Sequence, residues 1–460
     1  MNREALERLT KEELIDLILL QAEQLKQLQA DFEALKLKFE HNQKPPTTSK
    51  NSSQPPSRDQ KGNASKDKRL HRHGPPKGHA KHIRPFVAQP DHIVHLRKQR
   101  CDGCQADLSA VDGHLSKVNQ ITELPDAKAQ VIEVRQYKTD CPECGQVQVA
   151  EPPAGLEMER AFGARLEATV VYFRQEQHLS YVRTQTMLAS LYGVTISPGG
   201  IDAIMQRAGQ RAVDRMEAIE EQVRQSPVVY CDETLCRVSG DNWWEWVFCT
   251  LEAVRHVIRF NRSVDVIGDV MKAARAEVWV SDCLPAQLKA PSQQRQLCLA
   301  HQIRNLQAVI DRAPPAMWAT TMQSLFRYAI HLHHQREHLS PQAFQAKVAW
   351  LEQHLRVLLE QPLTEPAAGK LRGRYREHRD SLLVFLHRTD VEPTNNRSER
   401  ALRPSVIHRK VLNGFRSGWG AQAYAALASV IDTAELKSVH AFDVIQSVIG
   451  IPALPLPVRG

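Results

Sequence analysis

Between residues 227 and 299, the apolar positions fall into short runs that predict five β-strands and one helix. The strand runs are rich in β-branched and aromatic side chains and lie between turn-forming residues. The helix is predicted from Ser263, a suitable N-cap, because the apolar residues after it recur at helical spacing. The predicted strands cover residues 227–235, 243–250, 255–260, 277–280 and 296–299.

The connections between these runs predict how the strands pair. Tight turns make the first three strands antiparallel neighbours, and the helical crossover returns the fourth strand parallel to one of them. If the fourth strand lies beside the first, Asp232 and Asp282 meet at the carboxyl ends of adjacent strands, where α/β sheets bind ligands. Glu233 points to the opposite face because side chains alternate along a strand. The order predicts a ribonuclease-H-like α/β core whose aspartates share a hard divalent cation.

Residues 10–40 carry a heptad pattern that predicts a coiled coil and therefore self-association. The apolar positions alternate steps of four and three, with one polar residue in the seam that would fix the register. A solitary amphipathic helix packed on its own domain is the alternative. The seam consists of Leu14, Ile18, Gln21, Leu25, Leu28, Phe32, Leu35 and Phe39.

Residues 41–84 have almost no large apolar side chains and predict a disordered linker. They carry eleven Lys and Arg against Asp59 and Asp67, a net charge of +9, whereas the whole chain of 460 residues has +8. The basic excess is therefore confined to this segment. It is either a solvated tether or a contact for DNA phosphates, whose affinity would depend strongly on salt.

Two Cys-x-x-Cys pairs, Cys101 with Cys104 and Cys141 with Cys144, are separated by thirty-six residues. Gly103 and Gly145 suit the tight turns that direct two sulfurs at one metal. Four thiolates on two such knuckles are typical of a tetrahedral structural Zn²⁺ site, which leaves no position open for chemistry. The residues between the pairs, at 129–137, alternate as in a strand. The pattern predicts a small zinc-binding domain.

Residues 163–224 are predicted to be helical, with a Gly turn at 192–194 and a new helix that begins at Ser197 and Pro198. A helix, a short turn and a second helix are also typical of helix-turn-helix DNA recognition. An ordinary helical bundle fits equally well. The predicted DNA contacts are Gln206, Arg207 and Arg211.

The C-terminal third is mainly helical and polar. Residues 302–390 predict a helical insertion, and 413–420 a Gly-rich basic loop before a final helix. Between them, Thr394 or an Asn caps a short helix that should end or kink before Pro404. Glu399 lies in this helix and supplies a third carboxylate to a ribonuclease-H-like core. An ion pair between Glu399 and Arg403, four residues apart, is the alternative.

The motifs together resemble transposases of the insertion-sequence 66 family over nearly the whole chain. They are the N-terminal zipper, the cysteine pairs, YCDET at 230–234, CLAH at 298–301 with Arg304, and NNRSERALR at 395–403. The family is of the Asp-Asp-Glu type, so the resemblance implies a catalytic triad of Asp232, Asp282 and Glu399. Many members have Gly-Tyr after the second aspartate, where this chain has Cys283 and Leu284, so Asp282 is the least secure assignment.

The resemblance implies two Mg²⁺ (or Mn²⁺) ions for cleavage and transfer of DNA strands, in addition to the structural Zn²⁺. Phosphate contacts would come from Arg400, Arg403 and Lys410, and His301 would either support the site from a second layer or pack at a helix start. The implied partners are the element's terminal repeats, target DNA and accessory proteins of the same element. An inactive DNA-binding regulator and a nuclease without joining activity remain as alternatives.

These expectations describe a multidomain α+β protein. No apolar run approaches the roughly 20 residues that span a bilayer, and no signal segment is evident, which predicts a protein of the bacterial cytosol or nucleoid with unpaired thiols. The predicted parts are a coiled coil (1–40), a basic linker (41–84), a zinc-binding domain (85–155), a helical DNA-binding region (156–225), a catalytic core (226–412) and a C-terminal loop and helix (413–460).

Overall fold

A computed structural model describes residues 84–312 and 316–450, together with a few isolated positions before residue 84. The predicted coiled coil and basic linker lie outside the described residues. Within the described part, residues 84–131 with 191–193 form one compact unit, and residues 132–190 with 194–450 belong to the other. The predicted zinc-binding segment therefore extends across the boundary between the units. No helix in the described part is long and apolar enough to cross a membrane.

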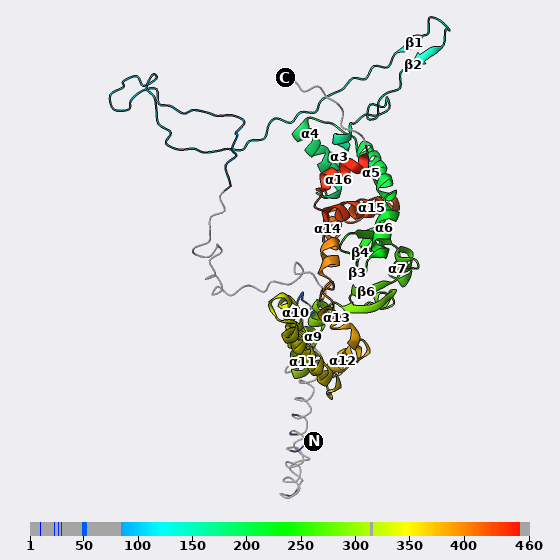
Figure 1. Ribbon diagram of the computed structural model, residues 1–460. Coiled ribbons are helices and arrows are strands. Elements are labelled where there is room, and N and C mark those ends of the chain that lie inside the picture. Colours follow the sequence, from blue (N-terminus) through cyan, green and yellow to red (C-terminus); the bar gives the residue numbers. More distant parts are fainter. Residues whose placement is uncertain are drawn as a thin grey trace. The chain divides into compact units, whose positions relative to one another are not determined.

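A five-stranded mixed sheet forms the centre of the larger unit (Figure 1). Its order is β5-β4-β3-β6-β7, with β3, β4 and β5 antiparallel to one another and β6 and β7 parallel to β3. This order is consistent with the predicted ribonuclease-H-like fold. The strands are β3 (Val228–Val238), β4 (Asp241–Cys249), β5 (Val254–Arg259), β6 (Ala276–Ser281) and β7 (Ser292–Leu297).

Local sequence explains where these elements begin and turn. Ser239 and Gly240 both have positive φ, at 52° and 92°, and join β3 to β4 by a two-residue turn of the kind that matches strand twist. Ser263 is the N-cap of α7 (Val264–Met271), as predicted. The fifth strand was placed too late in the sequence, since β7 begins at Ser292. Its first residues, SQQR, are polar and carry no strand signal.

Helices cover both faces of the sheet. Asp232 shares its face with Val247 and His256, and α14 and α15 contact this face through Ser405 and Ser429. The opposite face carries Trp279 and Glu233, and both bond to Gln287 of α8. The helices near the sheet are α6 (Met216–Gln225), α7, α8 (Pro285–Leu288), α9 (Leu299–Arg312), α14 (Asn396–Leu412) and α15 (Gly418–Glu435).

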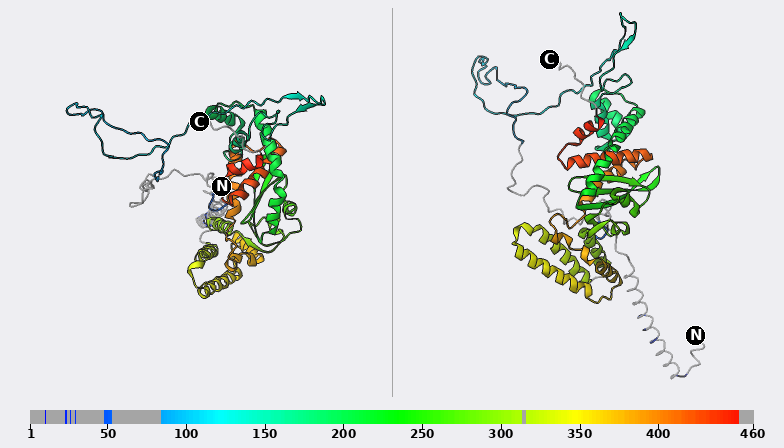
Figure 2. Two further views of the ribbon diagram at one scale, coloured as in Figure 1. Left: turned by 45° about the horizontal axis from the view of Figure 1, so that its top comes forward. Right: turned by 45° about the vertical axis from the view of Figure 1, so that its right-hand side comes forward.

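The segment predicted as a helical insertion is mainly helical, and its helices after α9 form a group beyond the sheet (Figure 2). Their apolar residues continue the core of the Asp232 face, which includes Tyr230, Val280 and Phe326. The insertion comprises α10 (Met317–His334), α11 (Pro341–Glu360), α12 (Pro366–Glu377) and α13 (Val384–His387), with 3₁₀ turns Arg336–His338 and Arg379–Ser381.

A second helical group packs on α15; three of its helices precede the sheet in sequence and the fourth, α16, follows α15 (Figure 1). The predicted N-cap is confirmed, because the Ser197 hydroxyl accepts a hydrogen bond from the Gly200 N–H at 3.0 Å. Gly209 lets two of the helices approach closely, since a Cβ there would lie 2.4 Å from that of Ala423. The group comprises α3 (Ala164–Gln175), α4 (Tyr181–Tyr192), α5 (Pro198–Val213) and α16 (Ala441–Ile449).

Three sequence expectations were wrong. Residues 129–137 form no strand; pairing begins one residue later, between β1 (Lys138–Asp140) and β2 (Val147–Val149), which flank the second cysteine pair. The helix that was predicted to end or kink before Pro404 does not end there, because α14 continues through the proline to Leu412. The carbonyl that loses its helical hydrogen bond belongs to Arg400, on an exposed part of the helix where water can replace the bond. α15 is also not the final helix, since α16 follows it.

The loop between α14 and α15 is fixed to the end of β3. The Phe415 N–H donates to the Arg237 carbonyl at 2.7 Å, and the Ser239 N–H donates to the Phe415 carbonyl at 2.9 Å. Gly414 makes this contact possible, because its φ is +95° and a Cβ there would lie 2.5 Å from the Arg237 carbonyl oxygen. The loop is therefore held like an added strand segment, although the sequence suggested only a Gly-rich connection.

Gly414→Ala is expected to lower the free energy of unfolding by about 3 kcal/mol, because the left-handed backbone and the clash each destabilise the fold. Urea unfolding measures this loss. Gly268→Ala is the matched control, since nothing lies within 4 Å of its Cβ and it is inside α7. The control should be neutral or more stable by up to about 1 kcal/mol. Equal effects in the two variants would contradict the prediction.

Candidate functional site

The strand register brings Asp232 and Asp282 to the same edge and face of the sheet. β3 and β6 run parallel, with Tyr230 opposite Val280. Asp232 lies two residues beyond Tyr230, and Asp282 two residues beyond Val280, so both side chains point to the same side. The edge is the carboxyl end of the parallel strands, where α/β sheets bind ligands.

Asn395 holds the start of α14 against this edge. Its side-chain amide donates to the Cys231 carbonyl at 2.8 Å, and its backbone N–H donates to the Cys298 thiol at 3.2 Å. The preceding Pro393 accepts the Leu299 N–H at 3.0 Å. Glu399 follows in the first turn of α14. The third predicted carboxylate is thus placed beside the strand ends that carry the two aspartates.

Asn395 was missed as a functional residue by the sequence analysis, which treated it only as a helix cap. Its side chain makes no capping bond; its oxygen accepts from the Ser398 hydroxyl at 2.9 Å while its nitrogen binds β3. The only local signal was an Asn before a helix with Ser three residues later. The bond to Cys231 joins residues 164 positions apart, and no local pattern predicts it.

The pKa of Asp232 reflects the negative charges of neighbouring carboxylates. Burial raises the pKa of Asp232 well above its usual range, and the negative charges of Glu233, Asp282 and Glu399 raise it further. Carboxylate oxygens are the ligands that hard divalent cations prefer, and a cation would supply the positive charge that the cluster lacks. The chemistry of this donor set therefore fits Mg²⁺ or Mn²⁺.

Glu399 also has two basic neighbours. Its Oε1 lies 3.4 Å from Arg304 Nη2 and 3.7 Å from His301 Nδ1, and about a third of its side chain is exposed. Burial and the charge of Arg304 lower the pKa of His301. Among the ion pairs of residues 84–312 and 316–450, Glu399 pairs with Arg304 and His301, and not with Arg403. His301 therefore lies beside the carboxylate that the sequence analysis assigned to the site.

A second set of possible metal ligands, Cys298, His301 and Glu399, is more closely spaced than the three carboxylates. In the described part of the chain, ligand atoms of Cys298, His301 and Glu399 lie within 4.8 Å of one another. Burial raises the pKa of Cys298 to about 12, so its sulfur is held as a thiol. A thiol that accepts the Asn395 N–H is a poor metal ligand, because metal binding requires the thiolate. The oxygen ligands remain the better candidates.

Glu233 is engaged on the opposite face of the sheet, as strand alternation predicts. Its carboxylate bonds to Arg262 Nη2 at 2.6 Å and to Gln287 Nε2 at 2.9 Å. The Arg262 guanidinium also lies 4.3 Å from the centre of the Trp244 ring. These contacts account for the buried Glu233 as part of the packing beneath the site.

The predicted DNA contacts fall into two groups. Arg400, Arg403 and Lys410 lie on exposed positions of α14, spaced three and seven residues apart, so they follow one side of the helix. Intramolecular partners occur in both groups, since Arg400 Nε donates to the Asn396 carbonyl at 3.4 Å. Arg207 pairs with the buried Glu167 at 2.6 Å, Gln206 donates to Asp202 at 3.0 Å, and Arg211 donates to the carbonyl of Ile449.

The two cysteine pairs adopt the same local turn. The Gln105 N–H donates to the Cys101 carbonyl at 3.0 Å, and the Gly145 N–H donates to the Cys141 carbonyl at 2.8 Å. Backbone N–H groups of the second cysteine and of the residue before it lower the pKa of Cys101 and of Cys141. Exposed turns that stabilise thiolates fit the ligand geometry expected of zinc knuckles.

Comparison with known protein families finds a match over the central part of the chain. A family model described as Transposase IS66 family, of the Asp-Asp-Glu type, matches residues 159–423, which is more than half of the chain. The matched region includes α3 to α6, the sheet, the insertion, α14 and the loop that follows it, and it ends within α15. No curated protein matches the chain.

Proposed function

Because the chain belongs to the Transposase IS66 family, we propose that it cuts DNA strands and joins them to a target, with Asp232, Asp282 and Glu399 as the metal-binding residues. The observation that carries this proposal is the meeting of three distant segments. The parallel register aligns the two aspartates, and Asn395 ties the helix that bears Glu399 to the same strand ends.

The carboxylates would hold two Mg²⁺ (or Mn²⁺) ions. When bound, such ions activate the attacking water or 3′-hydroxyl and stabilise the leaving 3′-oxygen in an in-line displacement. Arg304 and His301 lie at Glu399 and would position its carboxylate. The role proposed for these two residues is orientation, because each places one side-chain nitrogen within 4 Å of Glu399 Oε1.

The exposed basic side of α14 would bind the phosphates of the strand that reaches the carboxylates. Arg400 and Arg403 follow Glu399 within about one turn, so a phosphate chain could leave the site along the helix. Lys410 would extend the same path. Arginine and lysine side chains position nucleic acid without reading its sequence. The α5 residues Gln206, Arg207 and Arg211 remain predicted contacts.

Arg403→Ala is expected to weaken binding of every DNA duplex by a similar factor and to reduce the slope of log affinity against log salt by about one. Fluorescence anisotropy over a salt series measures both quantities. Arg379→Ala is the control, because Arg379 is an exposed arginine in the 3₁₀ turn after α12. An unchanged salt slope in Arg403→Ala would remove this residue from the phosphate path.

Strand transfer of a 3′-ended oligonucleotide from the element's own terminus into a plasmid, with Mg²⁺, tests the proposal itself. Cleavage followed by joining is expected. Cleavage without joining would favour the nuclease. DNA binding without either reaction, with the element's accessory proteins added, would favour the regulator. The resemblance left both alternatives open, and each gives a different product on the same gel.

We also propose that the two cysteine knuckles bind structural Zn²⁺. Cys141→Ser is expected to reduce zinc from about one ion per chain to less than half of that, because a four-thiolate site has no spare ligand. Atomic emission of the purified protein measures the zinc content. Cys236→Ser is the control, since burial raises the pKa of Cys236 to about 12 and it lies on β3. Equal zinc in the two variants would contradict the assignment.

A further inference from the structure

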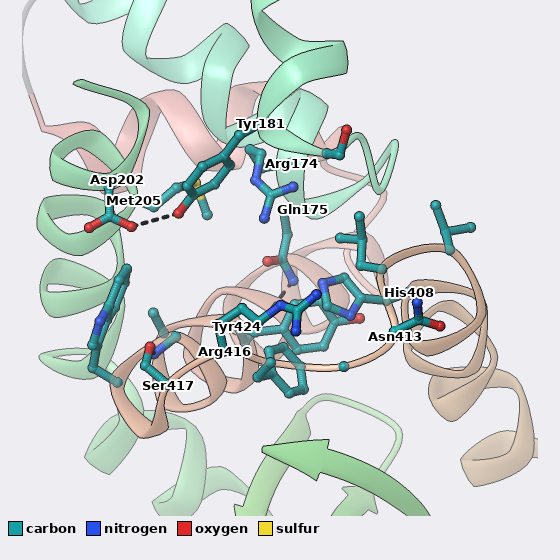
Figure 3. Close-up of a pocket in the computed structure, with 18 residues that line it drawn as sticks. Arg174, Gln175, Tyr181, Asp202, Met205, His408, Asn413, Arg416, Ser417 and Tyr424 are labelled. Atoms are coloured by element: carbon teal, nitrogen blue, oxygen red, sulfur yellow. Dashed lines mark hydrogen bonds between the residues drawn. The ribbon is translucent and has the colours of Figure 1, made fainter. Parts of the chain in front are cut away.

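A cavity of about 560 Å³ lies between α3, α4 and α5 on one side and the loop from α14 to α15 on the other (Figure 3). Neither aspartate of the candidate site nor Glu399 lines it. Its floor is the loop that hydrogen bonds fix to the end of β3. The cavity is therefore a built feature of this part of the fold, and it is separate from the carboxylates.

Aromatic and imidazole rings form much of its wall. His408 stacks on Phe415 with ring centres 4.8 Å apart and an angle of 22°, and Tyr424 lies 4.6 Å from His408. Trp419 also lines the cavity and keeps 41% of its surface exposed. Planar rings with free faces bind nucleobases by stacking, whatever the base. Trp419 offers the most exposed ring of this wall.

The polar groups of the cavity are not fully satisfied. Gln175 is 97% buried, its nitrogen donates to the Tyr424 carbonyl at 3.3 Å, and its oxygen Oε1 has no partner. Arg174 Nε is also buried without a partner. Figure 3 shows Arg174 and Arg416 approaching the cavity from opposite walls. A buried acceptor without a donor is costly, so a ligand that brings an N–H to Gln175 would satisfy it.

The cavity is connected to the candidate active site by two continuous elements. β3 carries Asp232 near its middle, two residues beyond the last residue paired with β6, and reaches the loop at Val238, six residues or about 20 Å away. α14 carries Glu399 in its first turn and His408 about 14 Å further along its axis. The exposed side of α14 with Arg400 and Arg403 lies along the same helix. A strand bound at the carboxylates could thus reach the cavity within a few nucleotides.

We propose that this cavity binds one unpaired nucleotide of the DNA, with the base stacked against Trp419, its donor edge at Gln175 Oε1 and its phosphate at Arg416. The inference rests on the proposed function, because it takes DNA as the substrate. A nucleotide combines the three features that the cavity offers, namely a planar ring, an N–H edge and a phosphate. An aliphatic ligand would leave Gln175 Oε1 and both arginines unused.

Three DNA probes test the inference with the full-length protein. All share one duplex; the first is blunt, the second has a four-nucleotide single-stranded tail, and the third has the same tail with abasic sites in place of the bases. Tails of both polarities are compared. The tailed duplex is expected to bind about tenfold more tightly than the blunt one, a gain that one stacked base can supply. The abasic tail is expected to lose most of this gain, because it retains only the phosphates.

Variants then locate the effect. Trp419→Ala should reduce the gain from the tail to less than threefold without changing affinity for the blunt duplex, and Trp419→Phe should largely retain the gain. Trp350→Ala is the matched control, because Trp350 is a tryptophan of α11 that is 46% exposed. Trp419 is exposed, so its replacement leaves the core intact.

Each outcome is decisive. Equal affinity for blunt and tailed probes, an abasic tail that binds as well as the normal tail, or a Trp419→Ala variant that keeps the full gain would overturn the inference while leaving DNA binding established. Failure to bind any of the probes at low salt would overturn the proposed function as well.

Discussion

Glu399→Gln is expected to reduce strand transfer by at least about 100-fold while affinity for DNA stays within about twofold. Even residues that only support a metal ligand cost about 10-fold to 100-fold when they are replaced, so loss of a direct ligand should cost more. The glutamine keeps the size and the hydrogen bonding of the side chain but removes the charge that the cations require. Strand-transfer yield with Mg²⁺, and anisotropy for DNA binding, measure the two effects.

Glu392→Gln is the control for this variant. Glu392 lies in the same segment, seven residues before Glu399, and its side chain is 53% exposed. It should transfer strands at the wild-type rate. If Glu399→Gln stays active, the third carboxylate must be sought elsewhere, whereas loss of activity together with loss of DNA binding would point to a folding defect.

Asp232→Asn and Asp282→Asn are expected to behave like Glu399→Gln, and Asp282 is the more informative test because its sequence context departs from the family.

The sheet could be predicted from the sequence because its signals are local. Alternating apolar residues, the Ser239-Gly240 turn and the Ser263 cap each fix one element within a few residues. β7 and β1 were misplaced because their polar sequences carry no strand pattern; their position follows from neighbouring strands. Pro404 misled for a related reason. A proline weakens a helix, but packing of α14 on the sheet outweighs the loss of one hydrogen bond.

The candidate site could be predicted only in part. Asp232 and Asp282 were assigned to the carboxyl ends of predicted strands, so the predicted strand order indicated that they lie close together. Glu399 was assigned from the family resemblance. The contacts that hold these carboxylates could not be predicted from the sequence. They join residues about 100 to 160 positions apart, as in the hydrogen bonds of Asn395 to Cys231 and of Arg304 to Glu399. The cavity beside Trp419 was missed for the same reason. It is formed by α3, α5 and a loop that no sequence pattern brings together.

His256→Leu is expected to lower the free energy of unfolding at pH 6.5 by about 3 to 5 kcal/mol, because it leaves the buried Glu245 and the partly buried Asp432 without their cation. His256 is 1% exposed and bonds to Glu245 at 3.0 Å and to Asp432 at 2.9 Å. The network joins β4, β5 and α15, and Ser405 of α14 donates to Glu245 at 2.6 Å. Urea unfolding, followed by the fluorescence of buried Trp246 and Trp279, measures the loss.

The same pair of proteins tests the charge of His256. Burial alone would lower the pKa of His256, but the hydrogen bonds and charges of Asp432 and Glu245 outweigh it and raise the pKa to about 9. Because the pKa of His256 is higher in the folded protein than in the unfolded chain, its protonation stabilises the fold. This stabilisation is complete below the pKa of the unfolded chain, near 6.5, and is lost as the pH rises through 9. The gap between wild type and His256→Leu should therefore shrink by about 3 kcal/mol between pH 6.5 and pH 9.5.

His408→Leu is the control for this pH dependence, since His408 is also a buried histidine but burial lowers its pKa to about 3. It is neutral in the folded protein throughout this range, and it is essentially neutral in the unfolded chain above pH 7.5. Its gap to the wild type should therefore stay constant from pH 7.5 to pH 9.5. A constant gap for His256→Leu as well would mean that the imidazole is uncharged, and that the Glu245 and Asp432 contacts act only as neutral hydrogen bonds in holding the sheet to α15.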